Sequence, residues 1–199
     1  IWTTIAARYP QVFFETSRTT PESYDLQKFF RNMVEHGVTH AFLEVTSHAL
    51  ELKRVVGCHF NGGIFTNLTP EHLDFHNDME NYFAAKERFF TERLVVSEKP
   101  NVWAVINVDD PYGARLAKTV AVKKIRYSLN EPVELVGKIV AADLSGMTLK
   151  VKSPQGRFEV RTPMIGLFNA QNILGAIGGA LQSGVSVEHL QAAIADFKG

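Results

Sequence analysis

The stretch "GGIFTNLTPEHLDFHNDMENYFAAKERFF", residues 62–90, decides the fold class of this chain. It opens with a short apolar run at 62–67, which is typical of a strand buried on both faces of a sheet. A polar loop follows, and a helix is predicted over 79–96. Similar apolar runs lie at 39–45 and 102–108. This alternation of strands and helices predicts an α/β fold with a mainly parallel sheet flanked by helices.

Helix signals also occur outside this stretch. A helix is predicted over residues 22–36, where Thr20 is suited to cap the start, Pro21 to the first turn and Gly37 to the end. Further helices are expected over 112–119, 169–183 and 186–197, with Ser186 as the cap of the last one.

The pattern changes between residues 123 and 165. Apolar and polar residues alternate there around glycine-containing turns, which predicts antiparallel hairpins. We therefore expect one domain over residues 1–199 that contains a small antiparallel β subsheet at 123–165.

The composition excludes several classes of protein. The chain has 199 residues, of which 45% are hydrophobic, and its 21 basic and 21 acidic residues give a formal net charge of zero. No basic block indicates nucleic-acid binding, and no apolar run reaches membrane-spanning length. The one cysteine, Cys58, indicates a reducing compartment, so a cytoplasmic protein without nucleic-acid or membrane partners is expected. The start at Ile1 suggests a piece of a longer protein.

Polar residues follow each of the three predicted strands. In open parallel sheets, ligands bind beyond the carboxyl ends of the strands, so these residues are expected to share one rim. They are Glu44 after the first strand, Thr66 and Asn67 after the second, and Asn107, Asp109 and Asp110 after the third. Asp109 and Asp110 precede Pro111 and also form an ordinary turn and cap signature.

The loop after the second strand carries two histidines. His72 and His76 are four residues apart, but without a convincing third ligand they are a weak indication of zinc. A magnesium ion held by Glu44 and His72 suits the carboxylate-rich rim better. The remaining histidines have no such context and are interpreted as structural or exposed: His36, His40, His48, His59 and His189.

Lys86 lies within an aromatic stripe on its predicted helix. Tyr82 and Phe83 are one turn before it, and Phe89 and Phe90 one turn after it. Lysine methylenes can cover apolar surface while the ammonium reaches water, which is the structural interpretation. The functional alternative is that the aromatic rings surround the Lys86 amine because this amine takes part in a reaction.

Four segments in order resemble one family: "TTP" at 19–21, "LEVTSHALELKRV" at 43–55, "FTNLTPEHLDFHNDMENYFAAK" at 65–86 and "INVDD" at 106–110. Together with "GLFNAQNILGAIG", they resemble the Mur ligases, and among these the UDP-N-acetylmuramoyl-tripeptide synthetases. The resemblance implies a central, ATPase-like domain. It also implies ATP-dependent transfer of a phosphoryl group to UDP-MurNAc-L-Ala-D-Glu and attack of a diamino acid on the acyl phosphate.

The resemblance implies roles for particular residues. Glu44 and His72 are expected to be Mg²⁺ ligands and catalytic residues. Lys86 is expected to carry a CO₂-derived carbamate that holds a second ion. Burial is consistent with this role, because it disfavours the ammonium and only a neutral amine attacks CO₂.

The resemblance also implies contacts with the substrates. Thr19, Thr20, Thr46 and Arg54 are expected to contact the UDP-MurNAc substrate, and Asn169 and Asn172 the adenine side of ATP. Three structural alternatives stay open: Thr20 as a helix cap, Arg54 as a solvated surface charge and Asn169 as a helix cap.

The sequence departs from the family pattern at the phosphate-binding loop. No Gly-Lys-Thr or Gly-Lys-Ser occurs in the 199 residues, and the family's amino-terminal and carboxy-terminal domains are also missing. Leu52 replaces a glutamine of some members, and Thr46 replaces a commoner serine. We therefore expect this chain by itself to have no ligase activity.

Two other functions stay open. One is a related ligase such as folylpolyglutamate or cyanophycin synthetase, although "TTP" and "LEVTSHALELKRV" favour the muropeptide branch. The other is a non-catalytic nucleotide-binding module, which the joint retention of Glu44, His72 and Lys86 argues against. The added amino acid is meso-diaminopimelate or L-lysine, with diaminopimelate the more widespread, and a monomer is expected.

Overall fold

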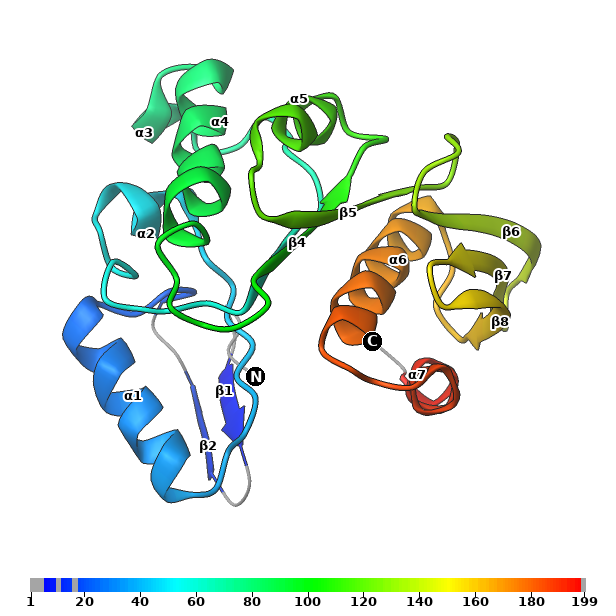
Figure 1. The fold of residues 1–199 in the computed structure, drawn as a ribbon, viewed down its shortest axis with the longest axis horizontal. Helices are drawn as coiled ribbons and strands as arrows, with labels where there is room; N and C mark the ends of the chain where they lie inside the picture. Colours follow the sequence, from blue (N-terminus) through cyan, green and yellow to red (C-terminus); the bar gives the residue numbers. More distant parts are fainter. Residues whose placement is uncertain (1–5, 10–11, 16–17, 198–199) are drawn as a thin grey trace. The chain divides into compact units, whose positions relative to one another are not determined.

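The computed structural model describes residues 6–9, 12–15 and 18–197 (Figure 1). The chain divides into two compact units. The first comprises residues 1–59 and 70–93, and the second comprises 60–69 and 94–199.

The first unit is mainly helical in its described part. Helix α2 packs on α4, and α3 also packs on α4. The helix predicted at 79–96 is α4 followed directly by the π-helical turn η1, so it ends earlier than expected. The elements are β1 (Ala6–Tyr9) and β2 (Val12–Glu15), which pair antiparallel, then α1 (Ser23–Glu35), α2 (Ser47–Glu51), α3 (Leu73–His76), α4 (Met79–Arg88) and η1 (Phe89–Arg93).

Helix α1 forms almost where it was predicted. It ends at Glu35, and Gly37 follows with φ +70°, a left-handed conformation that costs glycine little. The start differs from the prediction, because Glu22 is the N-cap and its side chain makes no capping bond. The prediction of Thr20 as the cap and Pro21 in the first turn is therefore wrong, since both precede the helix.

The strand predicted at 39–45 is not present. Only Leu43 forms an isolated bridge in this segment, and Phe42 is 57% exposed. Leu43 and Val38 instead pack with Phe29 and Phe30 around Met33 of α1. A strand requires a hydrogen-bonded neighbour along its length, and the described residues supply one only at Leu43. Glu44 therefore does not follow a strand end.

The second unit contains a six-stranded sheet in the order β3-β4-β5-β6-β7-β8. Strands β3 to β6 pair in parallel, and β6 to β8 pair antiparallel. This confirms a mainly α/β architecture with an antiparallel part. The strands are β3 (Gly62–Phe65), β4 (Trp103–Asn107), β5 (Lys123–Ser128), β6 (Leu135–Asp143), β7 (Gly146–Ser153) and β8 (Gly156–Thr162).

The antiparallel subsheet is narrower than 123–165. Strand β5 pairs in parallel with β4 on one side and with β6 on the other, so the antiparallel part begins at β6. Alternation of apolar and polar residues reports that one face of a strand is less buried. It does not report the direction of the neighbouring strand, which is why β5 was misassigned.

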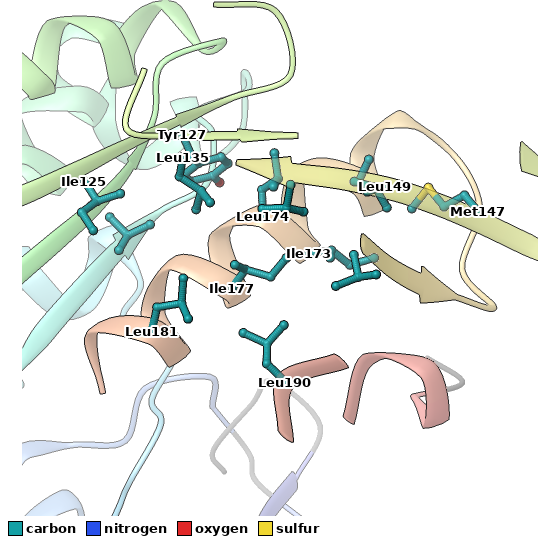
Figure 2. Packing of buried hydrophobic residues seen from close by; sticks show 14 residues of the cluster. Ile125, Tyr127, Leu135, Met147, Leu149, Ile173, Leu174, Ile177, Leu181 and Leu190 are labelled. Carbon is teal, nitrogen blue, oxygen red and sulfur yellow. The ribbon is translucent and has the colours of Figure 1, made fainter. Parts of the chain in front are cut away.

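Helix α6 (Leu167–Gln182) covers one face of this sheet and packs on β3, β4, β5 and β6. Figure 2 shows Leu174 and Ile177 of α6 pointing into the core that Tyr127 and Leu135 also line, and all four are fully buried. Leu174 lies directly over Gly137, where a Cβ would be 2.7 Å from its Cδ1. Helix α5 (Pro111–Thr119) packs on β4, and helix α7 (Val187–Asp196) packs on β8.

Ser186 caps α7 as predicted, because its hydroxyl accepts from the backbone N–H of His189. None of the helices within 18–197 is both long and apolar enough to cross a membrane.

Candidate functional site

Thr20 anchors the segment that carries Glu44 in the first unit. Its side chain is buried, with 1% exposure. The Thr20 hydroxyl donates to the carbonyl of Glu44 at 2.9 Å and accepts from the backbone N–H of Thr46 at 3.1 Å. Thr46 in turn caps α2 by accepting from the N–H of Ala49 at 3.2 Å. The Thr20 hydroxyl therefore holds two backbone groups of the protein, and its contact with a substrate stays a prediction.

Arg54 is a buried guanidinium, so its interpretation as a solvated surface charge is wrong. Its side chain is 10% exposed. One terminal nitrogen donates to the carbonyl of Thr20 at 3.1 Å, and the other lies 2.7 Å from a carboxylate oxygen of Glu22. Its Nε is buried without a hydrogen-bond partner among the residues that the structure describes. Arg54 is thus held in place by Thr20 and Glu22, while its buried Nε has no partner among the described residues.

Five rings from α2, α3, α4 and the N-cap of α3 form a contiguous cluster, here named the ring cluster. His48 is its centre, with ring centroids 4.9 Å from His72, 4.0 Å from Phe75 and 5.6 Å from His76. Tyr82 closes the cluster at 5.0 Å from His76, on which it stacks, and 6.1 Å from His72.

The buried histidine of the ring cluster is His76. It is 5% exposed, and its Nε2 lies 2.8 Å from the hydroxyl of Ser47, which is also buried. Burial and then His48 lower the pKa of His76, and the carboxylate of Glu51 only partly opposes this effect. Burial and then His72 lower the pKa of His48 in the same way. Both shifts favour the neutral imidazole over the charged one.

His72 is exposed and precedes α3 with φ +57°. A left-handed conformation is uncommon for a residue with a Cβ, and such residues concentrate at functional sites. His72 therefore lies outside α3, while its ring still contacts His48.

Lys86 is half-buried on α4, with its Nζ 5.8 Å from the centre of the Tyr82 ring. Burial lowers the pKa of Lys86, and the carboxylates of Glu44 and Glu71 only partly oppose this effect. The pKa shift raises the fraction of neutral amine at a given pH.

The three predicted metal ligands thus have a common neighbourhood in the first unit. His72 and Lys86 both lie beside Tyr82, and the exposed carboxylate of Glu44 acts electrostatically on Lys86. Within the described residues, no group of three or more His, Cys, Asp or Glu side chains could hold a metal ion. A divalent cation at this place therefore requires a ligand of another kind.

Three participants were not expected from the sequence: Ser47, His48 and Glu71. Glu71 directly precedes His72, and Ser47 and His48 directly follow Thr46, so adjacency to predicted site residues was the available signal. His76 was considered only as a partner of His72 for zinc, whereas its nitrogen bonds Ser47.

Two predicted nucleotide-binding residues lie on α6 in the second unit. Asn169 donates from its side-chain amide to the carbonyl of Ile165 at 2.7 Å. The N-cap of α6 is Gly166, so the interpretation of Asn169 as the cap is wrong. Asn172 is exposed on the same helix.

The acidic pair after β4 has a structural role. Asp110 caps α5 by accepting from the N–H groups of Tyr112 and Gly113, as its cap signature predicted. Asp109 accepts from the N–H of Leu129 at 2.7 Å and from the hydroxyl of Ser128. Burial alone would raise the pKa of Asp109, but these hydrogen bonds outweigh it and lower the pKa.

Comparison with known proteins gives a consistent result. Residues 1–180 match the Mur ligase middle domain. A UDP-N-acetylmuramoyl-L-alanyl-D-glutamate--2,6-diaminopimelate ligase from Geobacter metallireducens is 42% identical over 192 residues. The match covers 96% of this chain and 38% of that relative, so the chain spans less than half of the relative's length.

Solved structures show the same relationship. The structure of a UDP-N-acetylmuramoyl-L-alanyl-D-glutamate--2,6-diaminopimelate ligase superposes with a TM-score of 0.82 at 28% identity, covering 99% of this chain and 41% of that one. A MurF ligase from Thermotoga maritima in complex with ADP superposes with a TM-score of 0.61 at 16% identity, covering 78% of this chain and 34% of that one. The second likeness concerns the fold alone.

Proposed function

The chain belongs to the Mur ligase family, and we propose that it is the central domain of a ligase that adds 2,6-diaminopimelate to UDP-MurNAc-L-Ala-D-Glu with consumption of ATP. The observation that carries the proposal is the 42% identity over 96% of the chain to a ligase named for these substrates. This similarity also favours diaminopimelate over lysine and the muropeptide ligases over folylpolyglutamate synthetase. The product is a precursor of peptidoglycan.

We propose that magnesium binds beside Glu44, His72 and Lys86, with the carbamate as a necessary ligand because no three unmodified His, Cys, Asp or Glu side chains of the described residues could hold a metal ion. Glu44 and His72 would supply an oxygen and a nitrogen ligand, and Lys86 would supply oxygens as a carbamate. The Lys86 nitrogen attacks the carbon of CO₂, an N–C bond forms and the nitrogen loses its proton to water, which leaves an anionic carbamate. The half-buried position and lowered pKa of Lys86 support this modification, because they favour the neutral amine. Bound magnesium would neutralise the charge of phosphate oxygens.

The substrate contacts are part of the same proposal. The guanidinium of Arg54 would bind an anionic group of the UDP-MurNAc substrate, and Thr19 and Thr46 would add hydroxyl contacts. Asn169 and Asn172 would contact the adenine of ATP. Lys86, His72 and Glu44 would be the catalytic residues.

A segment exchange tests the proposed function. This chain would replace the matching 192-residue segment of the Geobacter metallireducens ligase, and phosphate release would be measured with ATP, UDP-MurNAc-L-Ala-D-Glu and diaminopimelate. We expect a functional hybrid, whereas the 199-residue chain by itself should remain inactive. A folded hybrid without any turnover would contradict the proposal.

Variants of the hybrid test the role of Lys86. Lys86→Ala should abolish turnover, and short carboxylic acids should partly restore it by replacing the carbamate. Lys118→Ala, which removes an exposed lysine of α5, is the matched control and should leave turnover unchanged. Full activity of the Lys86→Ala hybrid would rule out the carbamate.

A further inference from the structure

We propose that His76 is a positioning residue for Lys86, and that its bond to Ser47 and its stacking on Tyr82 hold α4 against α2. The inference rests on the proposed function only through the role of Lys86. His76 would touch neither substrate nor metal, so it would act through the two side chains that it contacts.

The first observation is that His76 connects two helices through a buried polar contact. The Nε2 of His76 at the end of α3 lies 2.8 Å from the hydroxyl of Ser47 at the start of α2. Both side chains are buried, at 5% and 1% exposure. Because a buried polar atom is costly without its partner, this pair selects one arrangement of α2 and α3.

The second observation is that His76 also contacts Tyr82, whose ring lies near Lys86. The rings of His76 and Tyr82 stack at 17° and 5.0 Å, and the Nζ of Lys86 lies 5.8 Å from the centre of the Tyr82 ring. Tyr82 and Lys86 are four residues apart on α4 and therefore share one face of that helix. A shift of the Tyr82 ring would accordingly move the environment of the lysine.

The third observation is that the same connection reaches Glu44 from the other direction. Ser47 directly follows Thr46, whose backbone N–H donates to the Thr20 hydroxyl, and that hydroxyl donates to the carbonyl of Glu44. Glu44 is one of the two carboxylates that act on Lys86. The Ser47–His76 bond thus connects the segment that carries Glu44 with the Tyr82 ring that lies beside the Lys86 amine.

An ordinary core histidine would explain the burial but would affect only stability. A positioning residue also changes the chemistry of Lys86 in a folded protein. Two readouts on the full 199-residue chain distinguish these roles: the carbamate signal in ¹³C NMR after addition of ¹³C-bicarbonate, and the rate at which an amine-reactive ester labels Lys86, measured by peptide mass spectrometry.

The informative variants alter one contact each. His76→Phe keeps a ring against Tyr82 but removes the bond, Ser47→Ala removes the same bond from the other side, and His76→Gln keeps an amide at similar reach. The structure offers a matched control in the second unit, where the Ser186 hydroxyl lies 3.0 Å from the Nδ1 of His189. The control variants are Ser186→Ala and His189→Phe.

We expect His76→Phe and Ser47→Ala each to lower the carbamate occupancy of Lys86 and to change its labelling rate. Each change should be about fivefold, which is the factor that corresponds to the usual net contribution of one hydrogen bond. The double variant should be no worse than either single variant, since both remove the same bond. His76→Gln should recover part of the loss, and the controls should match the unaltered chain. Circular dichroism establishes that each variant is folded.

Unchanged occupancy and labelling in a folded His76→Phe or Ser47→Ala chain would overturn the positioning role. If the unaltered chain forms no carbamate, the carbamate part of the proposed function fails. The labelling rate then still decides the positioning role, because it reports the surroundings of the amine without CO₂. If His76→Phe does not fold, Ser47→Ala provides the same decision.

Discussion

Replacing Thr20 by valine tests whether this residue holds the Glu44–Thr46 segment or only contacts a ligand. Valine has nearly the same shape as threonine but lacks the hydroxyl. The change removes the bond to the Glu44 carbonyl at 2.9 Å and the bond from the Thr46 N–H at 3.1 Å. If Thr20 served only a substrate, stability without substrate would not change.

The size of the effect follows from the surroundings of these two groups. A buried polar group left without its partner costs about 1–3 kcal/mol. Thr46 is half-buried and Glu44 is exposed, so water can reach both groups in part and the lower end of that range applies. We therefore expect Thr20→Val to lower the free energy of unfolding by about 2–3 kcal/mol in total.

The assay is urea unfolding followed by circular dichroism, without any ligand. Thr20→Ser is the matched control, because it keeps the hydroxyl and should cost only about 1 kcal/mol for the lost methyl group. The reasoning would be refuted if Thr20→Val remained within about 0.5 kcal/mol of the unaltered chain, the usual range for surface substitutions.

Three further predictions concern other contacts. Arg54→Lys should lower the free energy of unfolding by about 1 kcal/mol, because an ammonium cannot bond Thr20 and Glu22 in the same fork-like geometry; urea unfolding checks this. Gly178→Ala should cost about 1–2 kcal/mol, since its Cβ would be 2.6 Å from Val105, and Val105→Ala in the same chain should recover part of that loss. Asp109 has a folded-state pKa below its usual 3.8, so it stabilises the fold above that value and this contribution is lost as the pH falls through the folded pKa. Unfolding experiments between about pH 6 and pH 3 should show a weaker pH dependence for Asp109→Asn.

Local signals in the sequence were sufficient for most elements. The apolar runs of β3 and β4, the glycine after α1 and the Ser186 cap of α7 depend on residues within one or two turns of each other. The strand expected at 39–45 and the direction of β5 were wrong for the same reason. Both depend on a hydrogen-bonded neighbour, and periodicity contains no information on which segment supplies it.

The amino-acid sequence by itself determined the family, the α/β class and the unusual place of Lys86 among aromatic residues, because these follow from composition, spacing and motif order. Only the tertiary structure decided that Thr20 supports Glu44, that the largely buried Arg54 bonds Thr20 and Glu22, and that His76 joins Ser47 to Tyr82. These contacts connect residues 24 to 34 positions apart along the chain, apart from the stacking of His76 on Tyr82. A hydrogen bond or ring contact of this kind depends on distances that only the packing of helices and loops sets.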